Sequence, residues 1–289
     1  MTKKYLKHHL EWVVVKVAVA IFRLMGQSRA AQFGGWLARK IGPRMAVHRL
    51  ARENMQKALP DLTGREIEEN LLRMWENLGR NVGEIPFNRA ILDDTETVEI
   101  VGEEYLTAHV ENGKPAFFVT AHYGPWELVA LVGRRFGARA TGIYRAANNP
   151  LVEEYFQAMR ADPNYSFVPK GNEAARIILK AARNGGAIVL LNDQKLNTGV
   201  AIPFFGRDAM TAPAVAEIAC KMEVPVYPMR AERLEGGRRR LTIYPALDIL
   251  PTGDRKADVF ALLKAINETY EQWITERPDH WFWVHNRWS

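Results

Sequence analysis

The sequence predicts an α/β protein whose mainly parallel sheet is flanked by helices and preceded by an N-terminal helical region. From about residue 97 onward, short apolar runs alternate with helical patterns. Strands that alternate with helices favour a parallel sheet with helices on its faces. The length of 289 residues is sufficient for one such domain with additions.

Five segments are typical of strands, and four of them are short apolar runs. They are VEIVG, PAFFVTA, ATGIYR, YSFVP and AIVLLND, which begin at Val98, Pro115, Ala140, Tyr165 and Ala187. Helical stretches that begin near Glu103, Pro125, Pro150 and Asn172 separate them. Farther along, VPVYPMRAERL-EGG-RRRLTIYPAL predicts a hairpin at the sheet edge, with two glycines in its turn.

The segment before residue 97 is predicted to be helical, and so is the end of the chain. Ser28 and Pro43 are plausible helix starts, and Thr63–Glu66 has the pattern of a capping box. A last long helix is expected at about Lys256–Arg277, followed by the aromatic tail WFWVHNRW.

The excess of positive charge belongs to the front of the chain. Residues 1–52 contain eleven Lys or Arg and one acidic residue, whereas residues 53–289 contain 28 basic and 32 acidic residues. The same front segment includes Trp12–Met25, fourteen residues interrupted by Lys16 and Arg23, which is short of the ~20 apolar residues that span a bilayer. We expect either a short or tilted membrane anchor or an interfacial helix; an ordinary core helix is the third alternative.

The charge pattern also suggests a partner and a domain division. An anionic membrane fits the basic front end, and no aromatic-interleaved basic groove indicates nucleic acid. We expect an anchor or interfacial helix at residues 1–27 and one domain at 28–289. Within that domain, residues 28–96 are the helical part and 97–289 the α/β part.

A candidate general base follows the second predicted strand. His122 ends that strand, and Glu127 lies five residues later, just past Pro125, which can open a helix. A strand tip and a helix start can bring an imidazole and a carboxylate together for proton transfer. With 7 His and 33 acidic residues, about one such spacing is expected by chance. A helix-capping glutamate beside an unrelated histidine is therefore the alternative.

Further polar residues follow other predicted strands and are expected at the same rim of the sheet, where α/β proteins bind ligands. Arg145 suits a phosphate or an oxyanion, or else a surface salt bridge. Asp193 and Gln194 begin a segment that predicts either a substrate loop, with Phe204 and Phe205 lining an apolar wall, or a packed turn.

Other chemistries lack their sequence signals. No Gly-x-Ser-x-Gly, Gly-x4-Gly-Lys-Ser/Thr or Gly-x-Gly-x-x-Gly pattern is present. The single cysteine, Cys220, excludes an intramolecular disulfide and any multi-cysteine metal site, and the scattered histidines do not predict a metal site. We expect neither a metal nor a bound cofactor.

Several blocks in order resemble the bacterial late acyltransferases of lipid A biosynthesis, the lauroyl/myristoyl-type enzymes. The blocks are ENMQKALPDL, ENLGRNVGE, AHYGPWEL, YRAANNP, LLNDQ with GVAIPFFGRDAMT, VPVYPM and WFWVHNRW. The resemblance covers nearly the whole chain and implies the α/β fold of glycerolipid acyltransferases. It also implies an enzyme on the cytoplasmic face of the bacterial inner membrane that moves a fatty acyl chain from acyl carrier protein to a hydroxyl of a lipid A precursor.

By resemblance, His122 and Glu127 are the catalytic pair. The substrate contacts that the resemblance implies are Arg145, Asn148, Asp193 and Gln194. The acyl carrier protein thioester is then a co-substrate, and no further cofactor is implied. The tail departs from the family at Asn286, where many members have a second arginine. Two alternatives stay open: an acyltransferase for another acceptor, such as a lysophospholipid or an aminolipid, and a non-catalytic membrane-binding module.

Overall fold

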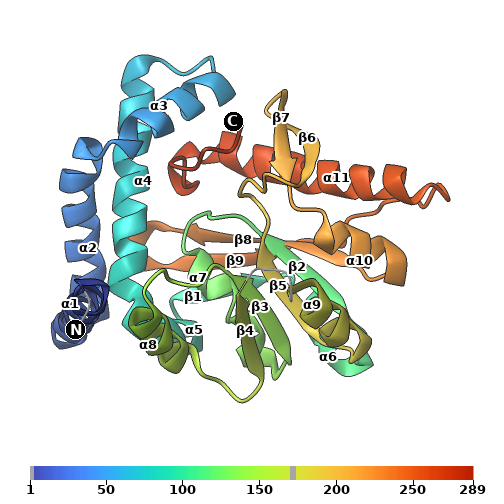
Figure 1. The fold of residues 1–289 in the computed structure, drawn as a ribbon, viewed down its shortest axis with the longest axis horizontal. Coiled ribbons are helices and arrows are strands. Elements are labelled where there is room, and N and C mark those ends of the chain that lie inside the picture. The colour runs from blue at the N-terminus through green and yellow to red at the C-terminus, as the bar shows by residue number, and fades with distance from the viewer. Residues whose placement is uncertain (1–2, 170–173, 289) are drawn as a thin grey trace.

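The computed structural model describes residues 3–169 and 174–288 (Figure 1). Its main sheet has the strand order β1-β9-β8-β2-β5-β3-β4 within the described chain. The strands are β1 (Val98–Val101), β2 (Ala116–Thr120), β3 (Ala140–Tyr144), β4 (Tyr165–Pro169), β5 (Ala187–Leu191), β8 (Val226–Arg233) and β9 (Arg239–Ile243). Every neighbouring pair is parallel except β8 and β9. The predicted α/β fold with a mainly parallel sheet is confirmed.

The predicted hairpin forms, but its predicted place at the sheet edge is wrong. Strand β8 pairs with β2 and strand β9 pairs with β1, so β1 and β4 are the edges. The charged side chains of β8 are paired inside the protein rather than exposed at an edge. Arg230 forms ion pairs with Glu232 and Glu276, and Arg233 binds the buried Glu84.

Helices cover both faces of the sheet. They include α5 (Asn88–Asp93), α6 (Glu103–Asn112), α7 (Trp126–Val129), α8 (Pro150–Arg160), α9 (Ala174–Arg183), α10 (Ala214–Met222) and α11 (Arg255–Glu276). Because side chains alternate along a strand, Phe117 and Val119 of β2 pack with the buried residues of α10 and α11. Ala116 and Phe118 pack on the other side, with α5, α6 and α7.

Within the described residues, four α-helices precede α5. They are α1 (Lys3–Met25), α2 (Gln27–Ile41), α3 (Val47–Ala58) and α4 (Gly64–Glu84). The predicted capping box at Thr63–Glu66 is confirmed. Pro43 lies instead in a 3-10 turn, and α3 begins at Val47. The predicted helix start at Asn172 lies outside the described residues; α9 is described from Ala174.

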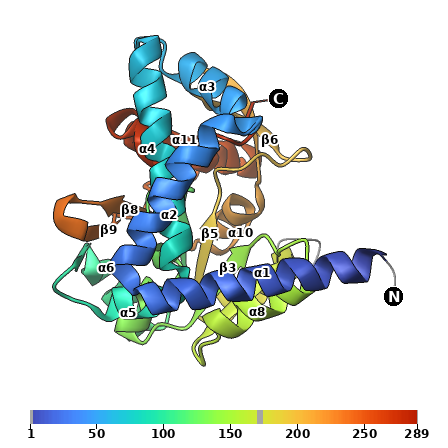
Figure 2. The ribbon, with the colours of Figure 1, turned by 90° about the vertical axis from the view of Figure 1, so that its left-hand side faces the viewer.

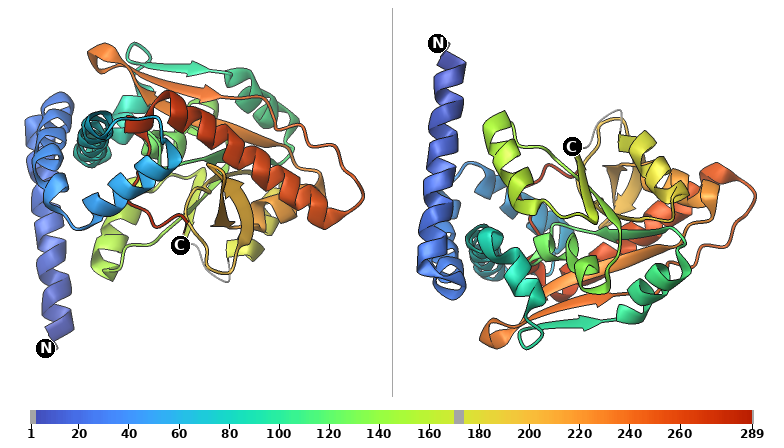
Figure 3. Two further views of the ribbon diagram at one scale, coloured as in Figure 1. Left: turned by 90° about the horizontal axis from the view of Figure 1, so that it is seen from above. Right: turned by 90° about the horizontal axis from the view of Figure 1, so that it is seen from below.

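The N-terminal helices contact one another and the α/β part. Helices α2 and α4 approach so closely that a Cβ added to Gly79 would lie 2.1 Å from the carbonyl oxygen of Gly34. Helix α1 runs beside α8, and its N-terminal end projects beyond the rest of the protein (Figures 2 and 3). The side chain of Asn149, at the start of α8, donates to the His8 carbonyl and to Glu11 at 2.8 and 2.9 Å. Among the described residues, no helix is long and apolar enough to cross a membrane.

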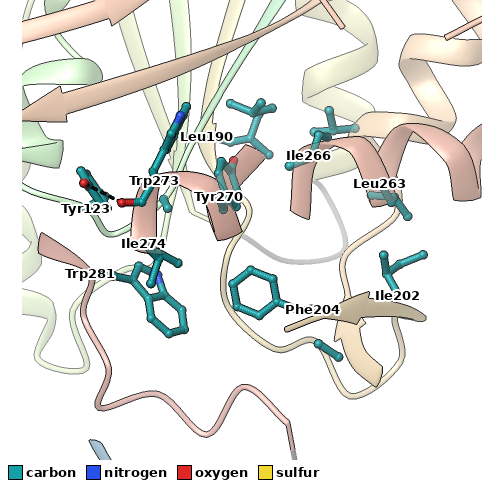
Figure 4. Close-up of a cluster of buried hydrophobic side chains, with 14 of the residues drawn as sticks. Tyr123, Leu190, Ile202, Phe204, Leu263, Ile266, Tyr270, Trp273, Ile274 and Trp281 are labelled. Carbon is teal, nitrogen blue, oxygen red and sulfur yellow. Dashed lines mark hydrogen bonds between the residues drawn. The ribbon is translucent and has the colours of Figure 1, made fainter. Parts of the chain in front are cut away.

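The segment after Gln194 forms an antiparallel pair, β6 (Val200–Phe204) and β7 (Arg207–Thr211). Phe204 does not line a substrate wall, because it is fully buried against the rings of Trp281 and Trp288. Figure 4 shows Phe204 in the same buried cluster as Tyr270 and Trp281. The packed turn is thus the alternative that the structure supports for Phe204.

Candidate active site

The side chain of His122 is held by a buried carboxylate. His122 Nδ1 lies 2.8 Å from Asp193 Oδ1, and the backbone N–H of His122 donates to Asp193 Oδ2 at 2.9 Å. Strands β2 and β5 are parallel neighbours, and the residues that follow them therefore meet at one rim. The backbone N–H of Asn192 donates to the Thr120 carbonyl at 3.1 Å and continues this pairing past the strand ends.

Asp193 accepts a third hydrogen bond, from the C-terminal tail. Trp281 Nε1–H donates to Asp193 Oδ2 at 2.8 Å. Burial alone would raise the pKa of the Asp193 carboxyl, but the neighbouring His122 and His285 hold this pKa well below its ordinary value. Asp193 is therefore ionised at neutral pH. Its ionised form stabilises the fold above the ordinary pKa, and this contribution is lost as the pH falls toward the folded-state pKa.

The ionised carboxylate fixes the tautomer of His122. A carboxylate can only accept, so the proton lies on Nδ1 and the lone pair of the neutral ring on Nε2. The side-chain amide of Gln194 agrees with this assignment, since its Nε2 lies 3.1 Å from His122 Nε2 and 2.9 Å from His285 Nε2. Nε2 of His122 is thus the atom that can take a proton, and the half-buried ring, with 20% of its side chain exposed, leaves access to it.

The C-terminal tail completes the surroundings of His122. The N–H of Phe282 donates to the His122 carbonyl at 3.0 Å. The rings of Trp126 and His285 lie edge-on to the imidazole, with centroids 5.4 and 5.2 Å away. Behind the site, the Tyr123 hydroxyl donates to the Trp273 carbonyl at 3.0 Å (Figure 4). The C-terminal tail, about 160 positions after His122 in the chain, therefore fixes the His122 loop.

Glu127 lies in the short helix α7, as predicted, and binds Arg160. Arg160 Nη2 lies 2.9 and 3.1 Å from the two carboxylate oxygens of Glu127. The guanidinium also lies near the rings of Tyr144 and Phe167. The structure brings His122 together with Asp193, and Glu127 together with Arg160. The predicted pairing of His122 with Glu127 stays a prediction.

Arg145 and Asn148 lie next to each other beyond the end of β3. Both are exposed, and Arg145 Nη2 lies 3.5 Å from Asn148 Oδ1. The adjacent Tyr144 hydrogen-bonds Glu153, and burial together with this contact raises the pKa of Tyr144 to about 12. Arg145 and Asn148 are therefore accessible to a ligand, whereas Tyr144 is engaged within the protein.

A cavity of about 660 Å³ begins beside Gln194. Its wall is mainly apolar and includes Ile143, Ala174, Ile178, Leu191, Ala214 and Val215. Ligand cavities in proteins commonly measure ≈ 300–1,000 Å³ and combine an apolar wall with a few polar groups. Gln194 lines this cavity and also contacts the His122 ring.

No cluster that could hold a metal ion occurs among the His, Cys, Asp and Glu side chains of the described chain. The arrangement instead contains an oriented imidazole, a buried carboxylate and an apolar cavity. These are the parts that general-base catalysis of transfer to a hydroxyl requires.

The sequence pointed to Asp193 and Gln194 as substrate contacts and missed their contact with His122. The sequence does not show the order of strands in the sheet. It therefore did not show that β2 and β5 are neighbours. Trp281 and His285 were also missed, although four aromatic residues in the short tail WFWVHNRW were an unusual signal.

A profile of the family described as bacterial lipid A biosynthesis acyltransferase matches residues 2–289. The chain belongs to this family. Its members transfer an acyl group to a lipid acceptor, which agrees with the oriented imidazole and the apolar cavity.

Two kinds of relative are similar to this lipid A biosynthesis family member. A lipid A biosynthesis acyltransferase of Haemophilus influenzae is 22% identical over 240 residues, which cover 81% of this chain and 73% of the relative. A phosphatidylinositol mannoside acyltransferase of Mycobacterium tuberculosis is 25% identical over 194 residues. That match covers 65% of this chain and 59% of the relative, less than two thirds of the relative's length.

The variant Asp193→Asn tests the orientation of His122 in this acyltransferase. The oxygen of the new amide can accept from the backbone N–H of His122 and from the Trp281 indole. Its NH₂ would then face His122 Nδ1 as a donor, so Nδ1 would have to accept and the imidazole proton would move to Nε2. We expect kcat to fall by ~10²–10⁴-fold with the fold retained, because Nε2 would no longer accept a proton. Initial rates of acyl transfer are compared with those of Asp258→Asn, another buried aspartate outside the site. Equal rates in the two variants would contradict the assignment.

Proposed function

We propose that this protein transfers a fatty acyl chain from acyl carrier protein to a hydroxyl of a lipid A precursor on the cytoplasmic face of the bacterial inner membrane. The observation that carries the proposal is the Asp193-oriented imidazole of His122 beside an apolar cavity. Family membership supports the acceptor, and the acyl carrier protein thioester is the donor that the sequence resemblance implies.

In the proposed reaction, His122 Nε2 removes the proton of the acceptor hydroxyl as its oxygen attacks the thioester carbonyl. The tetrahedral intermediate then collapses, the C–S bond breaks, and the imidazolium gives its proton to the departing thiolate. The carboxylate of Asp193 stabilises the imidazolium between these two steps. The exposed Arg145 and Asn148 are proposed to bind the polar part of a substrate, and Gln194 to contact the reacting groups.

Glu127 stays in the proposal as a second acidic group of the site. Its carboxylate binds Arg160, and both residues line a cavity of about 380 Å³ between α1, α5 and α8. Glu127 acts with His122 if the pair predicted from the sequence forms when substrate binds. If it does not, its ion pair with Arg160 shapes this cavity.

The apolar cavity beside Gln194 is proposed to hold the acyl chain. Its lining includes the polar residues Asn192, Gln194, Lys195, Asn197 and Thr198 and aliphatic side chains of β5, α9 and α10. A thioester carbonyl held beside Gln194 would lie next to the His122 imidazole, with the hydrocarbon tail against the apolar groups.

Exposed apolar side chains on α1 and α2 support the proposed membrane contact. On α1 they recur every three or four residues, which places them on one side of the helix. They are Leu6, Leu10, Val13, Val14, Val17, Ile21 and Leu24. Helix α2 adds Phe33, Trp36 and Leu37. Exposed apolar surface of this extent beside basic residues fits an anionic bilayer.

Another lipid acceptor is the second candidate. The relative from Mycobacterium tuberculosis is named for a phosphatidylinositol mannoside, and its sequence aligns with this chain over 194 residues. A hydroxyl on a lysophospholipid or an aminolipid would need the same base and the same acyl cavity.

A transfer assay tests the function. Purified protein, acyl carrier protein thioester and a lipid A precursor are expected to yield one added acyl chain, detected by mass spectrometry. His122→Ala is expected to lose ~10²–10⁴-fold in rate without unfolding, because the base is removed. Wild-type turnover in this variant would end the general-base assignment.

The variant Glu127→Ala is expected to be slower as well, and an unchanged rate would leave Glu127 as a partner of Arg160.

The lipids of a deletion strain distinguish the two candidate acceptors, since the lipid that lacks an acyl chain in that strain is the natural acceptor.

The variant Ala214→Phe tests the acyl cavity. Ala214 is half-buried in the cavity wall, so a phenyl ring there would shorten the space without removing a core side chain. We expect the preferred thioester to become shorter, with ~10-fold or more discrimination per excess methylene group, since one methylene is worth ~1–3 kcal/mol. The ratio of kcat/KM values for donors of different length measures this. An unchanged length preference would place the chain elsewhere.

The variant Leu10→Glu tests the membrane surface. Leu10 is 65% exposed on α1, and burying such a side chain is worth about 1.5–3 kcal/mol, so its replacement should weaken binding to anionic vesicles about tenfold or more. Leu250→Glu is the matched control, because Leu250 is 79% exposed in a distant loop. Flotation with vesicles measures binding, and added salt should weaken it because charge contributes. Equal binding by the two variants would refute the assignment of this surface.

A further inference from the structure

The loop that carries His122 is held from behind by a polar side chain of α4. Asn81 is 5% exposed, and its Nδ2–H donates to the carbonyl oxygen of Gly124 at 2.8 Å. The N–H of Gly124 donates to the His280 carbonyl at 2.9 Å. Gly124 has a positive φ of 53°, and a Cβ there would lie 2.1 Å from the Ala231 carbonyl oxygen. Three different segments therefore fix a residue two positions from His122.

Arg233 sets the orientation of Asn81. Its guanidinium donates to Asn81 Oδ1, which turns the NH₂ of that amide toward Gly124. The guanidinium also donates to Asn77 Oδ1 at 2.7 Å, and the backbone N–H of Arg233 lies 3.3 Å from His280 Nε2. Arg233 thus contacts both residues that hydrogen-bond to Gly124.

Glu84 anchors Arg233 to α4. The side chain of Glu84 is almost fully buried and accepts from both Arg233 and Arg239. Burial alone would raise the pKa of Glu84, but the two guanidinium groups lower it. Asn77, Asn81 and Glu84 lie three or four positions apart, so one side of α4 presents all three. Two positive charges face one carboxylate in this cluster.

We propose that Asn81 is a positioning residue for the reaction, which keeps the imidazole of His122 against Asp193 by fixing the Gly124 carbonyl. This inference rests on the proposed function, because it assigns His122 as the base. The hydrogen bonds from His122 to Asp193 require the loop to stay in place within a few tenths of an ångström, and misplacement by about 1 Å can cost 10²-fold in rate.

The variant Asn81→Asp replaces the donor to the Gly124 carbonyl oxygen with a second acceptor, with little change in volume. Its oxygen atoms can still accept from Arg233, and the surplus guanidinium charge accommodates a second carboxylate. We expect kcat to fall about tenfold or more, with KM for the thioester within twofold and a cooperative unfolding transition retained. Asn81→Ala removes the same donor without adding charge and is expected to lower kcat in the same direction.

Asn70→Asp is the matched control. Asn70 is 7% exposed on the same helix, accepts from Arg73 and donates to a backbone carbonyl at 2.9 Å. That carbonyl belongs to Glu66 of α4 rather than to the active-site loop. We expect its kcat and KM to stay within twofold of the wild type.

Two outcomes would overturn the inference. One is a kcat above half of the wild-type value in Asn81→Asp; the other is an equal loss of kcat in Asn70→Asp, which would indicate a general effect on α4. His122→Ala is measured in the same assay. If that variant is inactive while Asn81→Asp is fully active, the positioning role alone fails. If His122→Ala is active, the proposed function fails and this inference fails with it.

Discussion

The buried carboxylate of Asp193 is the group on which the site depends. Its three donors are the backbone and ring of His122 and the indole of Trp281, which come from the end of β2 and from the C-terminal tail. A buried charge is costly unless it is paired and hydrogen-bonded, so the energy of this carboxylate is low only when all three groups are in place. The C-terminal tail must therefore be packed onto the sheet for Asp193 to hold the imidazole of His122 in its orientation.

The two acidic residues that flank the His122 loop differ in their surroundings. Asp193 is 1% exposed and faces an imidazole, whereas the side chain of Glu127 is 28% exposed and faces the guanidinium of Arg160. A carboxylate enclosed with His122 is suited to fix a tautomer and stabilise an imidazolium. A carboxylate at a cavity wall with its own cation is suited to contact a ligand. Spacing along the chain could not indicate the contact of His122 with Asp193, because that contact depends on which strands are neighbours.

The sequence predicted the parts of the fold that depend on local pattern. The five strand-like segments correspond to β1 to β5, and the capping box marks the start of α4. The position of β8 inside the sheet and the contact of His122 with Asp193 depend on strand order, which arises from packing between distant segments. The rim argument still placed Asp193 and His122 near each other, because ligand sites follow the carboxyl ends of parallel strands.

Helix α4 connects the proposed membrane surface to the His122 loop. On one side, Gly79 meets α2 with no room for a Cβ, and α2 carries exposed apolar groups such as Trp36. On another side, Asn81 holds the Gly124 carbonyl. Closely packed helices shift as units rather than deform continuously. If the proposed membrane surface binds a bilayer, α2 and α4 would therefore set the height of His122 above it, and a hydroxyl near the lipid surface would meet the imidazole at a fixed depth.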